Sequence, residues 1–101
     1  MNKVLTNKKS DLVNLCKLYN VNTMYVFGSA GTDNFDDNSD IDILISFDEL
    51  PIDKYTENYF SLHYDLEKLF NRPIDLVTEN SLSNPYFIQG INRTKKLIYA
   101  A

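Results

Sequence analysis

Two aspartates that alternate along one apolar segment constrain this chain more than any other feature. Asp40-Ile41-Asp42 opens a run that stays largely apolar as far as Phe47, and it follows Gly28-Ser29 after ten intervening residues. Side chains alternate between the two faces of a strand, so Asp40 and Asp42 point to one side, about 6–7 Å apart, and Ile41 points to the other. We therefore predict a strand over Asp40–Phe47 that carries two carboxylates at one end.

Two neighbouring carboxylates repel each other unless one takes up a proton or a cation lies between them. Hard cations such as Mg²⁺ prefer oxygen ligands and complete their shell with substrate phosphates and water. The pattern therefore indicates Mg²⁺ that enters with a nucleoside triphosphate. The alternative is a generic acidic loop, since Asp33, Asp36 and Asp37 precede the pair and an isolated Asp-x-Asp is common.

The residues around Gly28-Ser29 favour the metal–nucleotide interpretation. Thr23–Phe27 is rich in aromatic and β-branched residues and predicts a short buried strand that ends at this pair. A glycine there lets the backbone approach a ligand closely, and the serine offers a hydroxyl and an N–H to an anion at the start of a helical turn. The alternative for Ser29 is an ordinary helix N-cap.

A third carboxylate lies on a later predicted strand. Asp75 alternates with apolar neighbours in the segment Pro73–Val77. If this strand lies beside the first two, Asp75 faces the same side as Asp40 and Asp42. Otherwise Asp75 is an aspartate in solvent near the start of a strand.

These residues together resemble the nucleotidyltransferase superfamily that includes DNA polymerase beta. The motif consists of Gly28-Ser29, ten residues, Asp40-x-Asp42 and the later Asp75. The whole chain, from its first predicted helix to Ile98-Tyr99, resembles the minimal nucleotidyltransferase (MNT) domains, of the MntA-like antitoxin type. The resemblance implies a polymerase beta-like fold.

The resemblance also implies a role for each residue. Asp40 and Asp42 would bind two Mg²⁺ ions, and Asp75 would join them on the catalytic metal and help to deprotonate an acceptor hydroxyl. Gly28 and Ser29 would hold the β- and γ-phosphates. The hydroxyl would attack the α-phosphate of ATP and release pyrophosphate, with two metals about 3.5–4 Å apart stabilising the attacking and leaving oxygens.

The chain departs from many MNT relatives directly after the Gly-Ser pair, where those relatives carry arginines. Here no basic residue follows Ser29 until Lys54. Three cations near the C-terminus could replace the missing charge: Arg93, Lys95 and Lys96. A domain that retains partner binding with weak or no catalysis is the alternative.

The order of predicted elements is α-β-β-α-β-α in one domain, residues 1–101. We predict an α/β (α+β) fold with a small mixed sheet, its first two strands antiparallel, helices mainly on one face and the carboxylates at one rim. The predicted segments are a helix over Asp11–Tyr19 capped by Ser10, strands over Thr23–Phe27 and Asp40–Phe47, a helix capped by Asp53 that reaches Phe70, a strand over Pro73–Val77, a helix over Pro85–Asn92, and a strand or helical turn over Lys96–Tyr99.

Residues outside the motif receive simpler interpretations. Cys16 is predicted to pack in the core, and His63 to lie on the surface. Most of the tyrosines are predicted at the core edge, and some could form a surface for a partner. This group comprises Tyr55, Tyr59, Tyr64, Tyr86 and Tyr99.

Charge and hydropathy exclude several classes of function. A net charge of −4 and a pI near 4.7 argue against direct nucleic acid binding and favour a small substrate or a basic protein partner. The first ten residues contain no signal-peptide-like apolar run, and no segment is apolar enough to span a membrane, so we expect a cytoplasmic protein.

The function expected from the resemblance is transfer of AMP from ATP to a hydroxyl of a partner protein. MNT domains resemble antitoxins that silence a HEPN-type RNase toxin, in studied cases by adenylylation of a tyrosine. A purely steric antitoxin is the alternative, because it needs the surface but not the aspartates. An aminoglycoside-type transferase is least favoured, since such enzymes generally carry a further domain and this sequence ends at Ala101.

Overall fold

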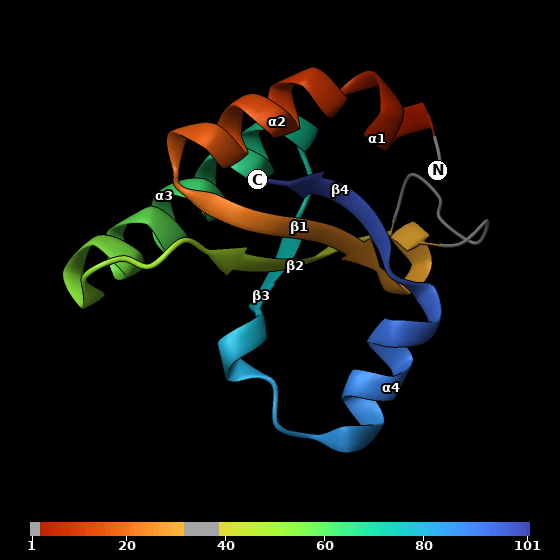
Figure 1. Cartoon of the computed structure of the whole chain (residues 1–101). Coiled ribbons are helices and arrows are strands. Elements are labelled where there is room, and N and C mark those ends of the chain that lie inside the picture. Colours follow the sequence, from red (N-terminus) through yellow and green to blue (C-terminus); the bar gives the residue numbers. More distant parts are fainter. Residues whose placement is uncertain (1–2, 32–38) are drawn as a thin grey trace.

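The computed structural model describes residues 3–31 and 39–101, and it alternates helices with the strands of one sheet (Figure 1). The elements are α1 (Lys3–Asn7), α2 (Lys9–Leu18), β1 (Val21–Phe27), the 3-10 turn η1 (Gly28–Gly31), β2 (Ile41–Phe47), α3 (Ile52–Phe70), β3 (Ile74–Thr78), the 3-10 turn η2 (Glu79–Ser81), α4 (Pro85–Thr94) and β4 (Lys96–Ala100). In this part of the chain, no helix has the length and apolar character needed to span a membrane.

The sheet has the strand order β3-β2-β1-β4. β1 pairs antiparallel with β2, as predicted, and antiparallel with β4 on its other side. β2 and β3 are parallel, so the chain must cross over between them, and α3 makes this crossover. The mixed sheet places the C-terminal strand β4 on one edge and β3 on the other.

The main core lies between the sheet and the helices α1, α2 and α3, which lie on one face in Figure 1. Alternate residues of each strand point into it, as the periodicity of two requires. Its fully buried members include Leu5, Leu12, Cys16, Met24, Val26, Ile41, Ile43, Ile45, Leu62 and Leu66. The predicted core position of Cys16 is confirmed.

The opposite face of the sheet is covered only in part, by α4 (Figure 1). Phe27, Leu44 and Ile91 form a second buried cluster there. The prediction that the helices pack mainly on one face is therefore confirmed, with α4 as the exception. Asp42 and Asp75, described below, lie on this second face of the sheet.

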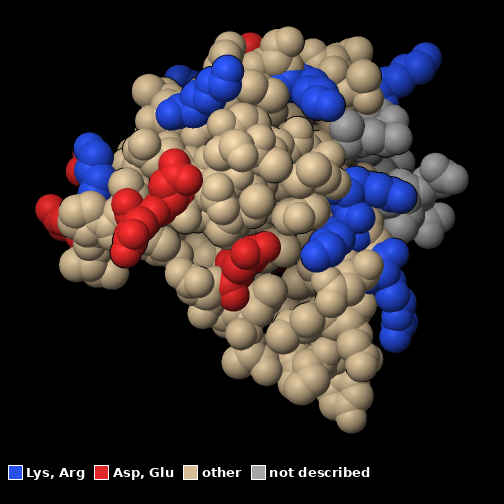
Figure 2. All heavy atoms as spheres, in the orientation of Figure 1, with Lys and Arg blue, Asp and Glu red and all other residues tan. Residues whose placement is uncertain are grey.

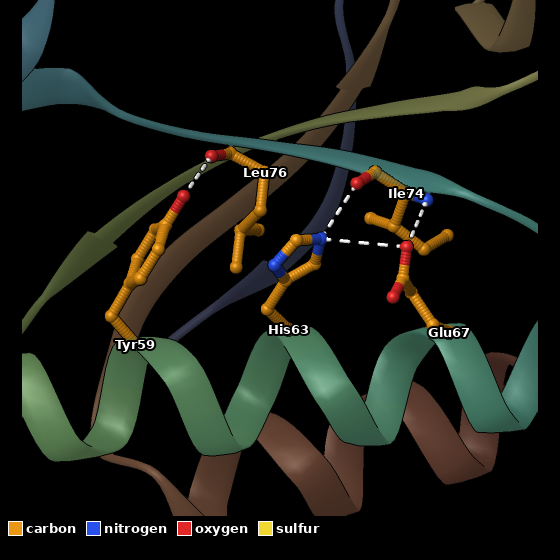
Figure 3. A network of polar contacts seen from close by, with 5 residues as sticks. All are labelled: Tyr59, His63, Glu67, Ile74 and Leu76. Carbon is orange, nitrogen blue, oxygen red and sulfur yellow. Dashed lines mark hydrogen bonds and ion pairs between the residues drawn. The ribbon is translucent and has the colours of Figure 1, made fainter.

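Side chains of α3 satisfy the outward-facing backbone of the edge strand β3 (Figure 3). The Tyr59 hydroxyl donates to the Leu76 carbonyl at 2.6 Å, and His63 Nε2 lies 2.7 Å from the Ile74 carbonyl oxygen. Glu67 accepts the N–H of Ile74 at 3.1 Å. His63 keeps 32% of its side chain exposed, so its predicted position at the surface holds, but the contact of its ring with β3 was not predicted.

Helix boundaries differ from the predictions where caps were assigned. α2 begins at Lys9, so its N-cap is Lys8 and not the predicted Ser10. The N-cap of α3 is Pro51 and not the predicted Asp53. Neither N-cap residue makes a side-chain hydrogen bond to its helix. Asn84 does cap α4, since its side chain accepts the N–H groups of Tyr86 and Phe87. The five-residue helix α1 was not predicted at all.

Candidate active site

The register of three strands brings two of the predicted aspartates together. Asp42 on β2 pairs with Phe27 on β1 and with Asp75 on β3. Paired residues of neighbouring strands project to the same face of a sheet, so Asp42 and Asp75 are side by side on the face that α4 only partly covers. Asp40 lies one residue before β2 and is exposed, so β2 begins at Ile41 and not at Asp40 as predicted.

The charges of Asp75 and Asp40 act on the carboxyl of Asp42. Burial raises the pKa of the Asp42 carboxyl, and the charges of Asp75 and then Asp40 raise it further. Within the described ranges, no group of three or more His, Cys, Asp or Glu side chains is close enough to hold a metal ion by itself. The arrangement is therefore a site of concentrated negative charge that would need ligands from elsewhere, such as phosphate oxygens, to complete a metal shell.

Two features of the structure require a glycine at position 28, its backbone conformation and its closeness to Asp42. The φ of Gly28 is +61°, in the left-handed region that favours glycine, and a Cβ built on this residue would lie 2.5 Å from Asp42 Oδ2. The N–H of Gly28 donates to Thr94 Oγ1 at 2.9 Å, and that hydroxyl donates to the Gly90 carbonyl at 3.2 Å. The backbone at the end of β1 is thus tied on one side to α4 and approaches the carboxylate on the other.

Ser29 lies inside η1, which begins at Gly28. A helical turn after the Gly-Ser pair was predicted, and the structure has one of the 3-10 kind. Ser29 is consequently not the N-cap of an α-helix. The acidic residues Asp33, Asp36 and Asp37, on which the alternative of a generic acidic loop rests, lie outside the described residues.

A cavity of about 320 Å³ opens between Asp42 and α4. Its lining residues are Phe27, Gly28, Asp42, Tyr86, Phe87, Gly90, Ile91 and Thr94. No local signal in the sequence indicates that α4 lines this cavity, because an apolar period shows which residues are buried but not which face of a sheet they cover. Thr94 is the clearest residue that the motif analysis missed.

Two basic residues lie near the aspartates, Lys95 on the same face of the sheet as Asp42 and Arg72 beside the segment that precedes Asp40. Lys95 Nζ lies 4.8 Å from the ring centroid of Tyr25, which shares the face of the sheet with Leu44 and Phe27. Figure 2 shows basic side chains on the right, over the region where α4 meets β4 in Figure 1. Arg72, not foreseen in the sequence, donates from Nη1 to the carbonyl of Ser39, directly before Asp40.

A family model described as Polymerase beta, Nucleotidyltransferase matches residues 6–101. The chain belongs to this nucleotidyltransferase family. The family resemblance drawn from the motif is thereby confirmed, as is the predicted enzyme class of nucleotidyltransferase. The polymerase beta-like fold is confirmed as well.

Named relatives agree with the family. The chain is 37% identical over 81 residues to a protein of Methanocaldococcus jannaschii named "Putative protein adenylyltransferase", covering 80% of this chain and 78% of that one. A crystal structure of a toxin-antitoxin with AMP-PNP matches with a TM-score of 0.71 and 23% identity, over 92% of this chain and 73% of that chain. A solved structure of a tri-AMPylated Shewanella oneidensis HEPN toxin in complex with MNT antitoxin matches with a TM-score of 0.66 and 20% identity. The match covers 95% of this chain and 72% of that chain.

Proposed function

We propose that this nucleotidyltransferase transfers AMP from Mg²⁺-bound ATP to a hydroxyl of a partner protein. The observation that carries the proposal is the pairing of Asp42 with Asp75 beside the glycine turn at Gly28. A turn that approaches Asp42, on a sheet face that α4 covers only in part, offers adjacent places for a triphosphate and for cations. The adenylyltransferase name of the 37% identical relative supports adenylyl as the transferred group.

The donor set suits hard cations. Asp40, Asp42 and Asp75 would hold two Mg²⁺ ions, provided that phosphate oxygens complete the shells, since oxygen ligands of this kind are those that Mg²⁺ prefers. When bound, the ions would supply charge stabilisation to the attacking and leaving oxygens.

The residues of the chain itself would position the reactants. Gly28 leaves room beside Asp42 that a side chain would fill, and Ser29 in η1 would bind the β- and γ-phosphates. The carboxylate of Asp75 would take the proton of the acceptor hydroxyl as it attacks the α-phosphate and pyrophosphate leaves. Lys95, held over Tyr25 on the same face of the sheet as Asp42, would offset phosphate charge.

A HEPN-type toxin is the partner that the comparisons favour. Structures similar in fold include a toxin-antitoxin with AMP-PNP and an AMPylated HEPN toxin with its MNT antitoxin. The net charge of −4 suits a basic protein partner better than nucleic acid. The proposed setting is a toxin–antitoxin pair in which this chain modifies the toxin.

The test uses the partner that copurifies with the tagged full chain from its own host. The partner is identified by mass spectrometry, expressed alone, and incubated with this chain, Mg²⁺ and ATP labelled at the α-phosphate. Label on the partner that requires both this chain and Mg²⁺ is the expected result. Absence of transfer, together with absence of ATP binding, would overturn the proposal.

A steric antitoxin is the second candidate, and a specific observation favours it. No basic residue lies between Ser29 and Lys54, whereas the resemblance to MNT domains implies arginines directly after the Gly-Ser pair, as in many of those relatives. The combined variant Asp40→Asn with Asp42→Asn separates the candidates. Partner neutralisation that survives in this variant indicates binding alone, whereas loss of neutralisation in an intact complex indicates catalysis.

A further inference from the structure

The cavity beside Asp42 extends along α4 to two exposed aromatic side chains. Tyr86 is 84% exposed and Phe87 45% exposed, yet both line the same cavity as Gly28 and Asp42. Large aromatic side chains left in water at the wall of a cavity mark a place where an apolar group can bind. This part of the cavity has no role in the catalytic arrangement described above.

The aromatic wall is held in place from both ends of α4. The ring of Phe87 packs edge-to-face on Phe27, with centroids 6.1 Å apart and planes at 78°. The Asn84 side chain accepts the N–H groups of Tyr86 at 2.9 Å and Phe87 at 3.4 Å. At the other end of α4, the hydroxyl of Thr94 accepts the N–H of Gly28. This hydrogen bond fixes the orientation of α4 relative to the glycine turn.

Few side chains in the described lining of the cavity could form hydrogen bonds with the edge of a base. Its polar side chains are Asp42, Tyr86 and Thr94. The hydroxyl of Thr94 already bonds the N–H of Gly28 and the carbonyl of Gly90. What the far end of the cavity presents is therefore mainly the faces and edges of aromatic rings.

We propose that Tyr86 and Phe87 form a nucleobase platform for the triphosphate whose phosphates lie at Gly28 and Asp42. The platform rests on the proposed function, and it adds how the base is recognised. Aromatic side chains bind bases by stacking, which is tolerant of base identity because every base has a π-face. The larger ring system of a purine stacks more strongly than a pyrimidine, so ATP and GTP should bind nearly equally and both more tightly than UTP.

The experiment titrates the full chain by calorimetry with the Mg²⁺ complexes of ATP, GTP, UTP and inorganic tripolyphosphate. Tripolyphosphate keeps the phosphates and lacks the base. Tyr86→Ala should weaken ATP and GTP about 5- to 100-fold and leave tripolyphosphate unchanged, since loss of a stacking side chain has an effect of this size. Tyr86→Phe should retain most of the affinity, and Tyr64→Ala, at a residue 63% exposed on α3, is the matched control.

The outcomes separate the platform from the proposed function. ATP affinity that is lost in Asp42→Asn but unchanged in Tyr86→Ala would overturn the platform alone. A preference for ATP over GTP greater than tenfold would overturn recognition by stacking. If neither ATP nor tripolyphosphate binds the wild-type chain, both the platform and the proposed function are wrong.

Discussion

At the scale of single residues, Gly28 is the position where backbone conformation and site geometry depend on each other most directly. The glycine in the motif was predicted to let the backbone approach a ligand. In the structure the backbone of Gly28 lies close to Asp42, which leaves no room for a Cβ. Its φ of +61° is a second reason for a glycine at this position. The sequence could indicate the first reason, but the contact with Asp42 depends on the pairing of β1 with β2.

Replacement of Gly28 by alanine tests this dependence. The left-handed backbone costs about 1–2 kcal/mol for a residue with a Cβ, and Asp42 must also move to relieve the 2.5 Å contact. Gly28→Ala should lower the free energy of unfolding by at least about 1 kcal/mol in urea titrations and weaken Mg²⁺-ATP binding.

Gly90→Ala is the matched control for Gly28→Ala. A Cβ at Gly90 would meet nothing within 4 Å, and the residue lies inside α4. Its replacement should raise the free energy of unfolding by about 0.5–1 kcal/mol, the usual gain when alanine replaces glycine in a helix. Equal stability of the two variants would contradict the account of Gly28.

Cys16 offers a second test at this scale. Burial raises the pKa of its thiol to about 12, so very little thiolate exists at pH 8. A maleimide or disulfide reagent should label the native chain very slowly at pH 8 and label it readily in denaturant. Rapid labelling of the native chain would show that Cys16 is not buried as described.

At the scale of elements, the hydrophobic period predicted the strands and the long helix well, because burial on one face leaves a clear record in the sequence. It did not predict α1, whose five residues bury only Leu5. The errors at Ser10 and Asp53 share one cause. Helix caps depend on local backbone geometry, which residue spacing does not specify.

The edge of β3 gives a prediction at this scale. Tyr59 on α3 donates to the carbonyl of Leu76, and burial raises the pKa of its hydroxyl, as do the charges of Asp75 and Tyr55. Tyr59→Phe should lower the free energy of unfolding by about 0.5–1.5 kcal/mol at pH 7, because it removes this hydrogen bond while keeping the ring.

Tyr64→Phe is the control for the edge prediction. Tyr64 lies on the same helix and is 63% exposed, so removal of its hydroxyl should change stability by less than about 0.5 kcal/mol. The comparison is made by urea denaturation of the three proteins under identical conditions. If Tyr59→Phe proves no less stable than Tyr64→Phe, the bond to β3 does not contribute to stability.

At the scale of the whole molecule, parallel pairing of β2 with β3 makes one site from residues that are far apart in the sequence. The resemblance to a known family predicted a site made of Asp40, Asp42 and Asp75, and the structure pairs two of these residues, Asp42 and Asp75. The sequence could not predict α4 on the second face of the sheet, nor the cation at Arg72 beside Ser39. These positions follow from how whole elements pack.

Transfer of a nucleotidyl group at the aspartate site is the central property proposed for this chain. The most direct measurement is transfer of label from α-labelled ATP to the copurifying partner in the presence of Mg²⁺, by the wild-type chain and by Asp42→Asn. The wild-type chain should modify the partner, and Asp42→Asn should do so at least about 100-fold more slowly while it still forms the complex. Transfer by Asp42→Asn at the wild-type rate would contradict the account.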